Sequence, residues 1–144
     1  MAVKLTAKEL ERLLDAEFPR TFHQNGGYVI EDVWLGGSRL RKHFDKASLR
    51  PGGTIAGTTL MALADLAMYV AILANIGWKP LTVTTNLNIN FLRKPDPRDL
   101  LGEARLLRLG KRSVVGDIAI RSEGQEELVA HATCTYAIPP ATVE

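Results

Sequence analysis

The stretch PGGTIAGTTLMALADLAMYVAILANIGW, from Pro51 to Trp78, predicts the element around which the rest of the chain folds. Glycines open it, and they permit backbone conformations and close approaches that a Cβ would block. From Thr58 to Ile76 there is no proline or glycine, and Gly77 is a suitable stop for a helix. A helix that is apolar on nearly every side is expected to be buried on nearly every side. We therefore expect a buried central helix here.

Asp65 is the only ionisable residue of that helix. An unpaired buried carboxylate is costly, so Asp65 must be paired, protonated or placed at a wet cleft. One interpretation is a structural carboxylate that is bonded to a neighbouring backbone or side-chain group. The other is a functional acid, because carboxylates are almost never fully buried without a reason. The residue chemistry alone leaves both interpretations open.

Length and composition favour a single soluble domain over residues 1–144. The net charge of +2 gives no argument for a nucleic-acid partner. Cys134 is the only cysteine, which excludes an intramolecular disulfide and fits a reducing compartment. The N-terminus MAVKLTAKELERLLDAEF is charged throughout and does not resemble a signal peptide. We expect a cytoplasmic protein.

The central helix is long enough to raise the question of a membrane span. Asp65 would then lie near the bilayer centre, at a cost of about 3 kcal/mol. Several Ala, Thr and Asn residues also dilute the hydrophobicity of the helix. We therefore expect no membrane partner.

The rest of the chain predicts a short helix and six strands. Thr6 and Glu9 match a capping box ahead of apolar residues at helical spacing, so an N-terminal helix is expected within residues 1–20. Alternating patterns predict strands over 28–35, 38–44, 82–91, 100–109, 113–120 and 128–138, a loop over 45–57 and a tail over 139–144. One apolar helix against a curved antiparallel sheet gives an α+β fold. Apolar surface that one sheet cannot cover predicts self-association.

The strand over 82–91 has the cleanest pattern, with an apolar and a polar face. The apolar face is expected to carry Val83, Leu87, Ile89 and Phe91, and the polar face Thr82, Thr84, Asn86, Asn88 and Asn90. The polar row fits a ligand wall and a hydrogen-bonded subunit seam equally well.

Several chemistries can be set aside. The glycine spacing over 52–59 resembles a P-loop, but Thr58 occupies the position of the essential lysine. No G-x-S-x-G elbow is present. His23, His43 and His131 are scattered without metal-ligand spacing, so no metal site is expected. Cys134 falls on an apolar strand face and is expected in the core, not as a nucleophile.

GGTIAGTTLMALADLAM followed by TTNLNINFLRKP resembles the PaaI-type branch of the hot-dog-fold acyl-CoA thioesterases, in the 4-hydroxybenzoyl-CoA thioesterase superfamily. The resemblance extends from Tyr28 to Ile138. It implies a hot-dog fold, in which a six-stranded antiparallel sheet wraps the helix. It also implies a homodimer or a dimer-of-dimers tetramer, with active sites between subunits.

The resemblance also implies roles for individual residues. The catalytic acid of the family falls on Asp65, the loop glycines fall on Gly53 and Gly57, and a helpful Ser or Thr of the third strand falls on Thr84. Three positions depart from the family motif N-x-x-G-x-x-H-G-G. Arg50 stands in place of the Asn, Ala56 in place of the His, and Thr58 in place of the second glycine of the pair.

Helix geometry agrees with a site that is shared between subunits. Gly57 and Asp65 are eight residues apart, which separates them by about 12 Å along a helix axis. One helix cannot easily present both residues to a single carbonyl group. Gly57 of one subunit and Asp65 of its neighbour can do so, as the family arrangement implies.

The expected function is hydrolysis of an acyl-CoA, possibly with an aromatic or medium-chain acyl group. Asp65 would act as general base or nucleophile, and the Gly57 amide would polarise the thioester carbonyl. No cofactor is expected beyond the coenzyme A of the substrate. The alternatives are a non-catalytic module that binds acyl-CoA, suggested by the missing Asn and His, and a related hydratase or dehydratase, which would need a His that the loop and helix lack.

Cations are expected near the CoA phosphates. Arg93, Lys94, Lys111 and Arg112 lie at predicted strand ends, where each is also an ordinary solvated turn charge. Arg50 would recognise an acidic acyl group or a CoA phosphate, or pair with a surface carboxylate. The substrate-binding set expected from the sequence is Arg50, Gly53, Ala56, Thr58, Asn86, Arg93, Lys94, Lys111 and Arg112.

Overall fold

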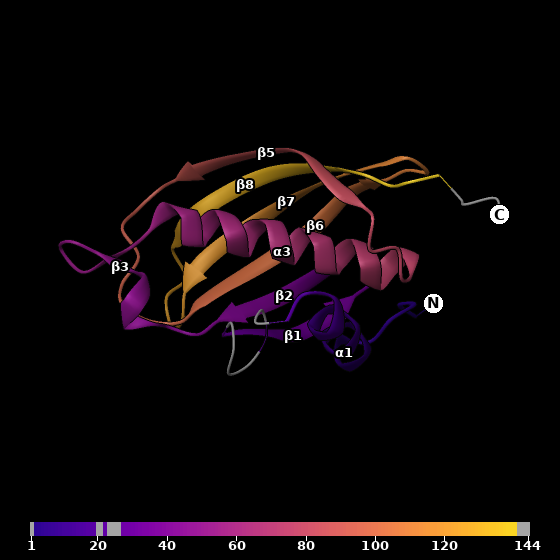
Figure 1. Ribbon diagram of the computed structural model, residues 1–144. Coiled ribbons are helices and arrows are strands. Elements are labelled where there is room, and N and C mark those ends of the chain that lie inside the picture. Colours follow the sequence, from indigo (N-terminus) through magenta and orange to yellow (C-terminus); the bar gives the residue numbers. More distant parts are fainter. Residues whose placement is uncertain (1, 20–21, 23–26, 141–144) are drawn as a thin grey trace.

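The computed structural model describes residues 2–19, 22 and 27–140. His23 and most of the tail after Pro139 lie outside these residues. Helix α3 (Gly57–Ile76) runs across the concave face of a six-stranded sheet, and the shorter helix α1 (Ala7–Glu17) lies beside the edge strand β1 (Figure 1). The predicted α+β architecture of one long helix on an antiparallel sheet is confirmed.

The capping box predicted for α1 is present. The Thr6 hydroxyl accepts from the Glu9 N–H, and the Glu9 carboxylate accepts from the Thr6 N–H. Leu10 and Leu14 are buried one turn apart, and Glu11 accepts a 2.7 Å hydrogen bond from the Ile30 N–H of β1. These contacts fix α1 on the domain through both apolar packing and a polar bond.

All neighbouring strands of the sheet are antiparallel, in the order β1-β2-β6-β7-β8-β5. The strands are β1 (Tyr28–Trp34), β2 (Gly37–Lys42), β5 (Val83–Phe91), β6 (Leu100–Leu109), β7 (Ser113–Ser122) and β8 (Leu128–Ala137). The chain after β5 crosses the sheet to β6, so β5 pairs with β8 and forms an edge. The predicted loop over 45–57 contains a 3-10 turn (Lys46–Ser48) and a small hairpin of β3 (Leu49–Arg50) and β4 (Thr54–Ile55).

Helix α3 is the core of the domain. Eleven of its twenty residues are buried, including every residue from Ala67 to Ala74. Gly102 and Gly116 let the sheet approach it closely, because a Cβ at Gly116 would lie 2.7 Å from the Met68 sulfur. Within the described part of the chain, α3 is the one helix long and apolar enough to span a membrane, and here it is the mostly buried core helix.

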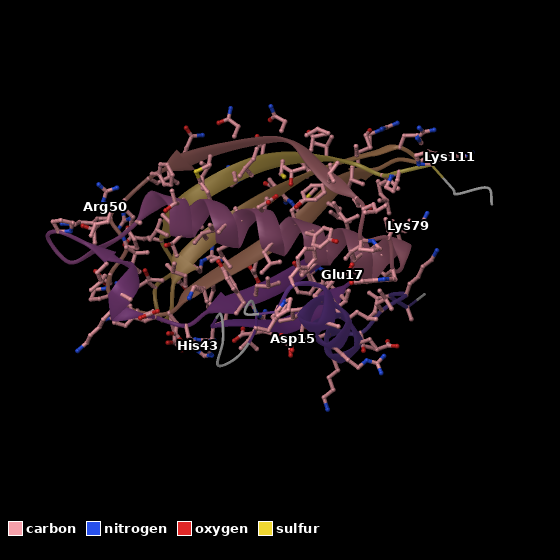
Figure 2. The ribbon with its side chains drawn as sticks, in the orientation of Figure 1. Asp15, Glu17, His43, Arg50, Lys79 and Lys111 are labelled. Carbon is pink, nitrogen blue, oxygen red and sulfur yellow. The ribbon has the colours of Figure 1, made fainter. Side chains whose placement is uncertain are left out.

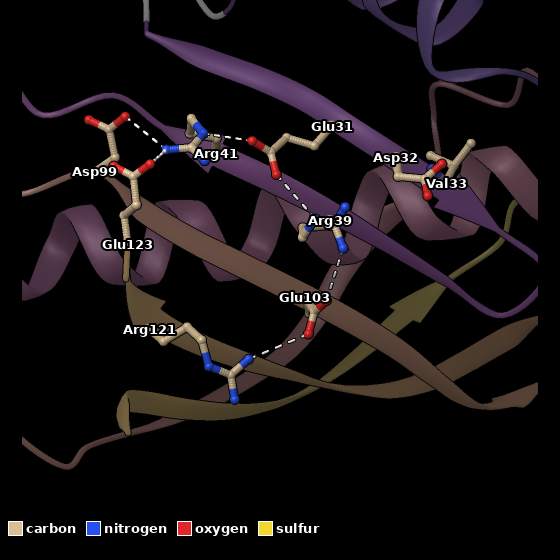
Figure 3. A network of polar contacts seen from close by, with 9 residues as sticks. All are labelled: Glu31, Asp32, Val33, Arg39, Arg41, Asp99, Glu103, Arg121 and Glu123. Carbon is tan, nitrogen blue, oxygen red and sulfur yellow. Dashed lines mark hydrogen bonds and ion pairs between the residues drawn. The ribbon is translucent and has the colours of Figure 1, made fainter. Parts of the chain in front are cut away.

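A network of ion pairs covers the face of the sheet opposite α3 (Figure 3). Arg41 of β2 joins Glu31 of β1 at 2.6 Å and Asp99, just before β6, at 3.0 Å. Arg39 and Arg121 extend the network through Glu103. Charged side chains therefore link β1, β2, β6 and β7 on this face, and the apolar helix α3 packs on the other face.

Candidate functional site

Asp65 is the ninth residue of α3 and is partly exposed. Its Oδ1 atom accepts two short hydrogen bonds, one from the Thr84 hydroxyl at 2.7 Å and one from the Tyr136 hydroxyl at 2.6 Å. Among the described residues, no donor reaches Oδ2. The carboxylate is thus held by one oxygen and keeps the other free.

The carboxylate opens onto a shallow depression of about 350 Å³. Asp65, Thr84 and Tyr136 form its polar end, and its remaining lining is Phe18, Tyr69, Pro80, Thr82 and Val83. An acid that faces such a depression, with apolar surface beside it, has the composition of a small-molecule site.

Tyr136 is the contact that sequence reasoning missed. It is only 3% exposed, its ring stacks on Tyr69 with centroids 6.0 Å apart, and its hydroxyl points at Asp65. Burial, together with the charge of Asp65, raises the pKa of Tyr136, so the hydroxyl remains a donor throughout the physiological range. A signal was present: Tyr136 falls on the inward face of the last strand, where its polar tip needs a partner and Asp65 is the one acid on the facing helix.

The prediction that Thr84 shares a face with Asn86 is wrong. A bulge at Thr85 shifts the register, so that Thr84 pairs with Tyr136 whereas Asn86 pairs with Thr135. The extra residue turns Thr84 toward α3 and Asp65. Asn86 lies on the opposite face, away from the carboxylate that Thr84 contacts.

Gly57 is the first residue of α3. Within residues 2–19, 22 and 27–140 its N–H has no acceptor, as is normal in the first helical turn. It lines a second depression of about 360 Å³ with Phe91, Arg93 and Lys94. A Cβ at Gly57 would lie 3.2 Å from the Phe91 ring, so a side chain there would crowd the ring.

The two depressions share no lining residue. One protomer therefore holds the free helix amide in one depression and the free carboxylate oxygen in another. This separation agrees with the expectation that one helix does not present Gly57 and Asp65 to the same carbonyl group.

The loop residues of the expected site gather at the Gly57 end of α3. Arg50 and Gly53 lie on the exposed β3–β4 hairpin, where Gly53 has a φ of +76° that favours glycine. Ala56 is the N-cap of α3 and offers no side-chain hydrogen bond, and Thr58 lies in the first turn.

The expected cations do not gather in one protomer. Arg50 and Lys111 lie toward opposite ends of the molecule (Figure 2). Arg93 makes a two-bond pair with Glu127, at 2.8 and 3.0 Å, beside the depression that Lys94 also lines. Lys111 lines a third depression with Lys4 and Lys79. The neighbouring Arg112 is exposed, and its carbonyl accepts the Ile138 N–H.

Among the described residues, Cys134 is buried in the core, and His43 and His131 each bond a carboxylate. Cys134 is 1% exposed, and burial, with the nearby charge of Asp65, raises its pKa to about 12, which confirms its core position. His131 bonds Asp117 at 3.0 Å, and His43 bonds Asp99 at 3.1 Å. The described residues contain no group of three or more His, Cys, Asp or Glu that could hold a metal ion.

A family model described as the thioesterase superfamily matches residues 52–136. The chain belongs to the thioesterase superfamily. The match begins in the β3–β4 hairpin and ends at Tyr136, so it includes Gly57, Asp65, Thr84 and Tyr136, while α1, β1 and β2 precede it. The family, the hot-dog fold and the assignment as a thioesterase-type enzyme agree with the resemblance seen in the sequence.

Relatives of this thioesterase-superfamily chain carry similar names. A candidate esterase from Saccharolobus solfataricus is 31% identical over 134 residues, which are 93% of this chain and 86% of that protein. The crystal structure of a candidate thioesterase from Silicibacter sp. TM1040 is 42% identical, with a TM-score of 0.87 over 96% of this chain and 94% of that one. A third, from Ralstonia eutropha JMP134, is described as a candidate thioesterase related to phenylacetic acid degradation. It is 31% identical, with a TM-score of 0.72 over 78% of this chain and 85% of that one.

Proposed function

We propose that this protein hydrolyses acyl-CoA thioesters and that Asp65 is the catalytic carboxylate. The observation that carries the proposal is the hydrogen bonding of Asp65. Thr84 and Tyr136 both bond Oδ1, which fixes the carboxylate and leaves Oδ2 directed to a water molecule or to the substrate. A fixed carboxylate with one free oxygen is suited to act as a general base or a nucleophile.

The site is completed by a second copy of the chain. Strand β5 is a sheet edge, and seven of its nine residues are exposed, including the apolar Val83 and Phe91. An exposed edge strand with apolar residues is suited to pair with another strand. Antiparallel pairing of β5 with its copy, around a two-fold axis, would bring the Gly57 end of one subunit toward the Asp65 depression of the other. The assembly is a dimer or a dimer of dimers.

The proposed chemistry uses the Asp65 carboxylate and the Gly57 amide together. Asp65 takes a proton from a water molecule while the water oxygen attacks the thioester carbon. Negative charge develops on the carbonyl oxygen, where the Gly57 N–H of the partner subunit and the positive end of its α3 stabilise it. The C–S bond then breaks, and the proton passes to the leaving sulfur, giving a carboxylic acid and free CoA. If Asp65 attacks directly, the intermediate is an anhydride that water hydrolyses.

The remaining expected residues are assigned to the CoA side of the site. Arg50, Gly53, Ala56, Thr58, Arg93 and Lys94 belong to the Gly57 end, and Lys111 and Arg112 reach the same ligand from the other subunit. Antiparallel pairing supports this arrangement because it places opposite ends of two protomers together. Asn86 lies on the face of β5 opposite Thr84, so we assign it to the contact between subunits and not to the carboxylate.

The test is release of free CoA thiol from short, medium and aromatic acyl-CoAs. Asp65→Asn keeps the size of the side chain but cannot accept a proton, so turnover falls by at least about a hundredfold. Asp32→Asn, an exposed carboxylate of β1, is the matched control and retains wild-type turnover. Full activity of Asp65→Asn would exclude the assigned role.

Ala56 supports a second candidate function, a module that binds acyl-CoA without hydrolysing it. This N-cap carries no hydrogen-bonding side chain at the position where the family motif has His. A binding module releases no thiol from any member of the panel, yet CoA thioesters raise its Tm by mass action.

A further inference from the structure

The depression beside Asp65 has an apolar half whose outer wall comes from α1. Phe18, Tyr69, Pro80 and Val83 face the polar end formed by Asp65, Thr84 and Tyr136. Phe18 is 47% exposed, although a large aromatic side chain gains by being buried. A group attached to a carbonyl at Asp65 would cover this surface.

Phe18 is held in place and is not a loose surface residue. It is the C-cap of α1, and its N–H donates to the Leu14 carbonyl at 2.7 Å. Its ring meets Tyr69 edge to face, with centroids 6.4 Å apart and planes at 77°. The Tyr69 hydroxyl in turn donates to the Pro80 carbonyl at 2.7 Å. The wall is therefore preorganised by α1 and α3 together.

Thr82 lines the same depression between Pro80 and Val83 and is only 3% exposed. Its buried hydroxyl has no hydrogen-bond partner among the described residues. Because that oxygen is covered by protein atoms, Thr82 contributes packing to the wall and not a polar contact to a ligand.

The position of the walls, and not the volume, sets the size of the group. About 350 Å³ describes an open depression of one protomer, and the partner subunit proposed to pair with β5 would cover its Val83 side. The Phe18 ring is then the wall that this chain itself places opposite the polar end formed by Asp65, Thr84 and Tyr136.

We propose that Phe18 is a specificity-determining residue that sets the upper size of the acyl group. The proposal rests on the proposed thioesterase function, and it goes beyond it because Phe18 lies outside the family match over residues 52–136. The superfamily core supplies the carboxylate and its donors, and α1 adds the wall. Selection of the acyl group is then separable from the hydrolytic chemistry.

The experiment compares kcat/KM for acetyl-, hexanoyl-, phenylacetyl- and dodecanoyl-CoA in wild type, Phe18→Ala and Phe18→Leu. In Phe18→Ala we expect about a tenfold loss for the hexanoyl and phenylacetyl thioesters, a gain for the dodecanoyl thioester, and little change for the acetyl thioester. The kcat/KM values of Phe18→Leu should lie between those of wild type and Phe18→Ala. Leu107→Ala, which removes an exposed side chain of β6 outside this depression, should reproduce the wild-type profile.

The outcomes separate this inference from the proposed function. Suppose that wild type is active and Asp65→Asn is not. If wild type and Phe18→Ala then rank the four thioesters alike by kcat/KM, Phe18 does not select the acyl group, while the thioesterase assignment stays in place. If no thioester is hydrolysed, the same four ligands are compared by the rise in Tm that each produces. A loss confined to the medium-sized ligands in Phe18→Ala supports the wall, and equal shifts in all variants overturn it. Far-ultraviolet circular dichroism of each variant confirms that α1 is intact.

Discussion

At the scale of single residues, the two hydroxyls on Asp65 Oδ1 explain how a carboxylate is accommodated in an apolar helix. Both donors are close, at 2.6 and 2.7 Å, and both come from strands that face α3. A carboxylate that accepts two hydrogen bonds recovers much of what it loses on leaving water. Because both bonds use one oxygen, the same arrangement stabilises the charge and leaves Oδ2 available.

Tyr136→Phe tests the part of this arrangement that the sequence did not predict. A hydrogen bond to a charged group is worth about 1.5–3 kcal/mol, and Thr84 retains part of the hold. We therefore expect kcat to fall about tenfold with little change in KM. Steady-state kinetics on the acyl-CoA panel measures both constants.

Tyr28→Phe is the matched control for that measurement. It removes a tyrosine hydroxyl of β1 that lines neither the Asp65 depression nor the Gly57 depression. We expect its kcat to remain within a factor of about two of wild type. An equal fall in both variants would mean that the loss does not depend on the hydrogen bond to Asp65.

The residue scale also shows where sequence reasoning reaches its limit. Asp65 was evident as the one acid in an apolar helix, and the resemblance added Gly57 and Thr84. The orientation of Thr84 was missed because a bulge changes the face of every later residue, and no single residue type marks it. Tyr136 lies in the predicted strand over 128–138, but the bond from its hydroxyl to Asp65 depends on how that strand and the helix are placed against each other, which alternation does not show.

At the scale of elements, the long periodic segments were predicted well and the pairing between them less well. Helix α3 ends at Ile76 with Gly77 as its C-cap, as expected, and β6 covers the predicted 100–109. The position of β5 next to β8 and the small β3–β4 hairpin were not predicted. Strand neighbours depend on long-range contacts, whereas alternation is local to the chain.

The ion-pair network on the outer face predicts acid sensitivity of the sheet. Burial alone would raise the pKa values of Glu31 and Asp99, but hydrogen bonds from Arg41 and neighbouring groups outweigh it and lower both. The folded state therefore binds fewer protons than the unfolded state near these values. Their contribution is fully present above the ordinary pKa values of 4.5 for Glu and 3.8 for Asp, and is lost as the pH falls through the lowered values.

Urea unfolding as a function of pH measures this contribution. We expect the free energy of unfolding to be nearly constant above about pH 5 and to fall steadily below about pH 4. Arg41→Met removes bonds to Glu31 and Asp99, so its stability should change less over the acidic range. Lys8→Met, on the exposed face of α1, changes charge equally and should keep the wild-type pH dependence. A wild-type stability that is flat down to about pH 3 would contradict the network's role.

At the scale of the whole molecule, one protomer carries both halves of the proposed thioesterase site without joining them. The Gly57 amide and the Asp65 carboxylate open onto different depressions, and β5 presents an exposed edge. Sequence spacing alone indicated this separation, since eight helical residues span about 12 Å. The partner that closes the gap could not be read from periodicity, because an exposed strand edge has the same pattern whether or not another copy covers it.

Mixing two inactive variants tests whether the site is shared. Gly57→Pro removes the amide N–H at the first helical position, where proline is tolerated, and Ala56 already has the extended backbone that a following proline requires. The proline also places a Cβ 3.2 Å from the Phe91 ring. Gly57→Ala adds the same Cβ but keeps the N–H, so it is measured beside Gly57→Pro and should retain activity. In a two-fold dimer, pairing Gly57→Pro with Asp65→Asn places both changes in one site and leaves the other site intact. Unfolding and refolding an equal mixture should therefore restore about a quarter of wild-type turnover from two variants that are each nearly inactive.

Analytical ultracentrifugation of the same samples shows whether the mixed protein is a dimer or a tetramer. The control is an equal mixture of Asp65→Asn with the double variant Asp65→Asn,Gly57→Pro. It should stay inactive because every subunit lacks the Asp65 carboxylate. Activity above the two separate variants requires that Gly57 of one subunit serves Asp65 of another. A mixture that forms dimers yet remains as inactive as its components would instead place both groups in one subunit. The free edge of β5 would then serve assembly alone, and the Gly57 amide and the Asp65 carboxylate would have to act within the same protomer.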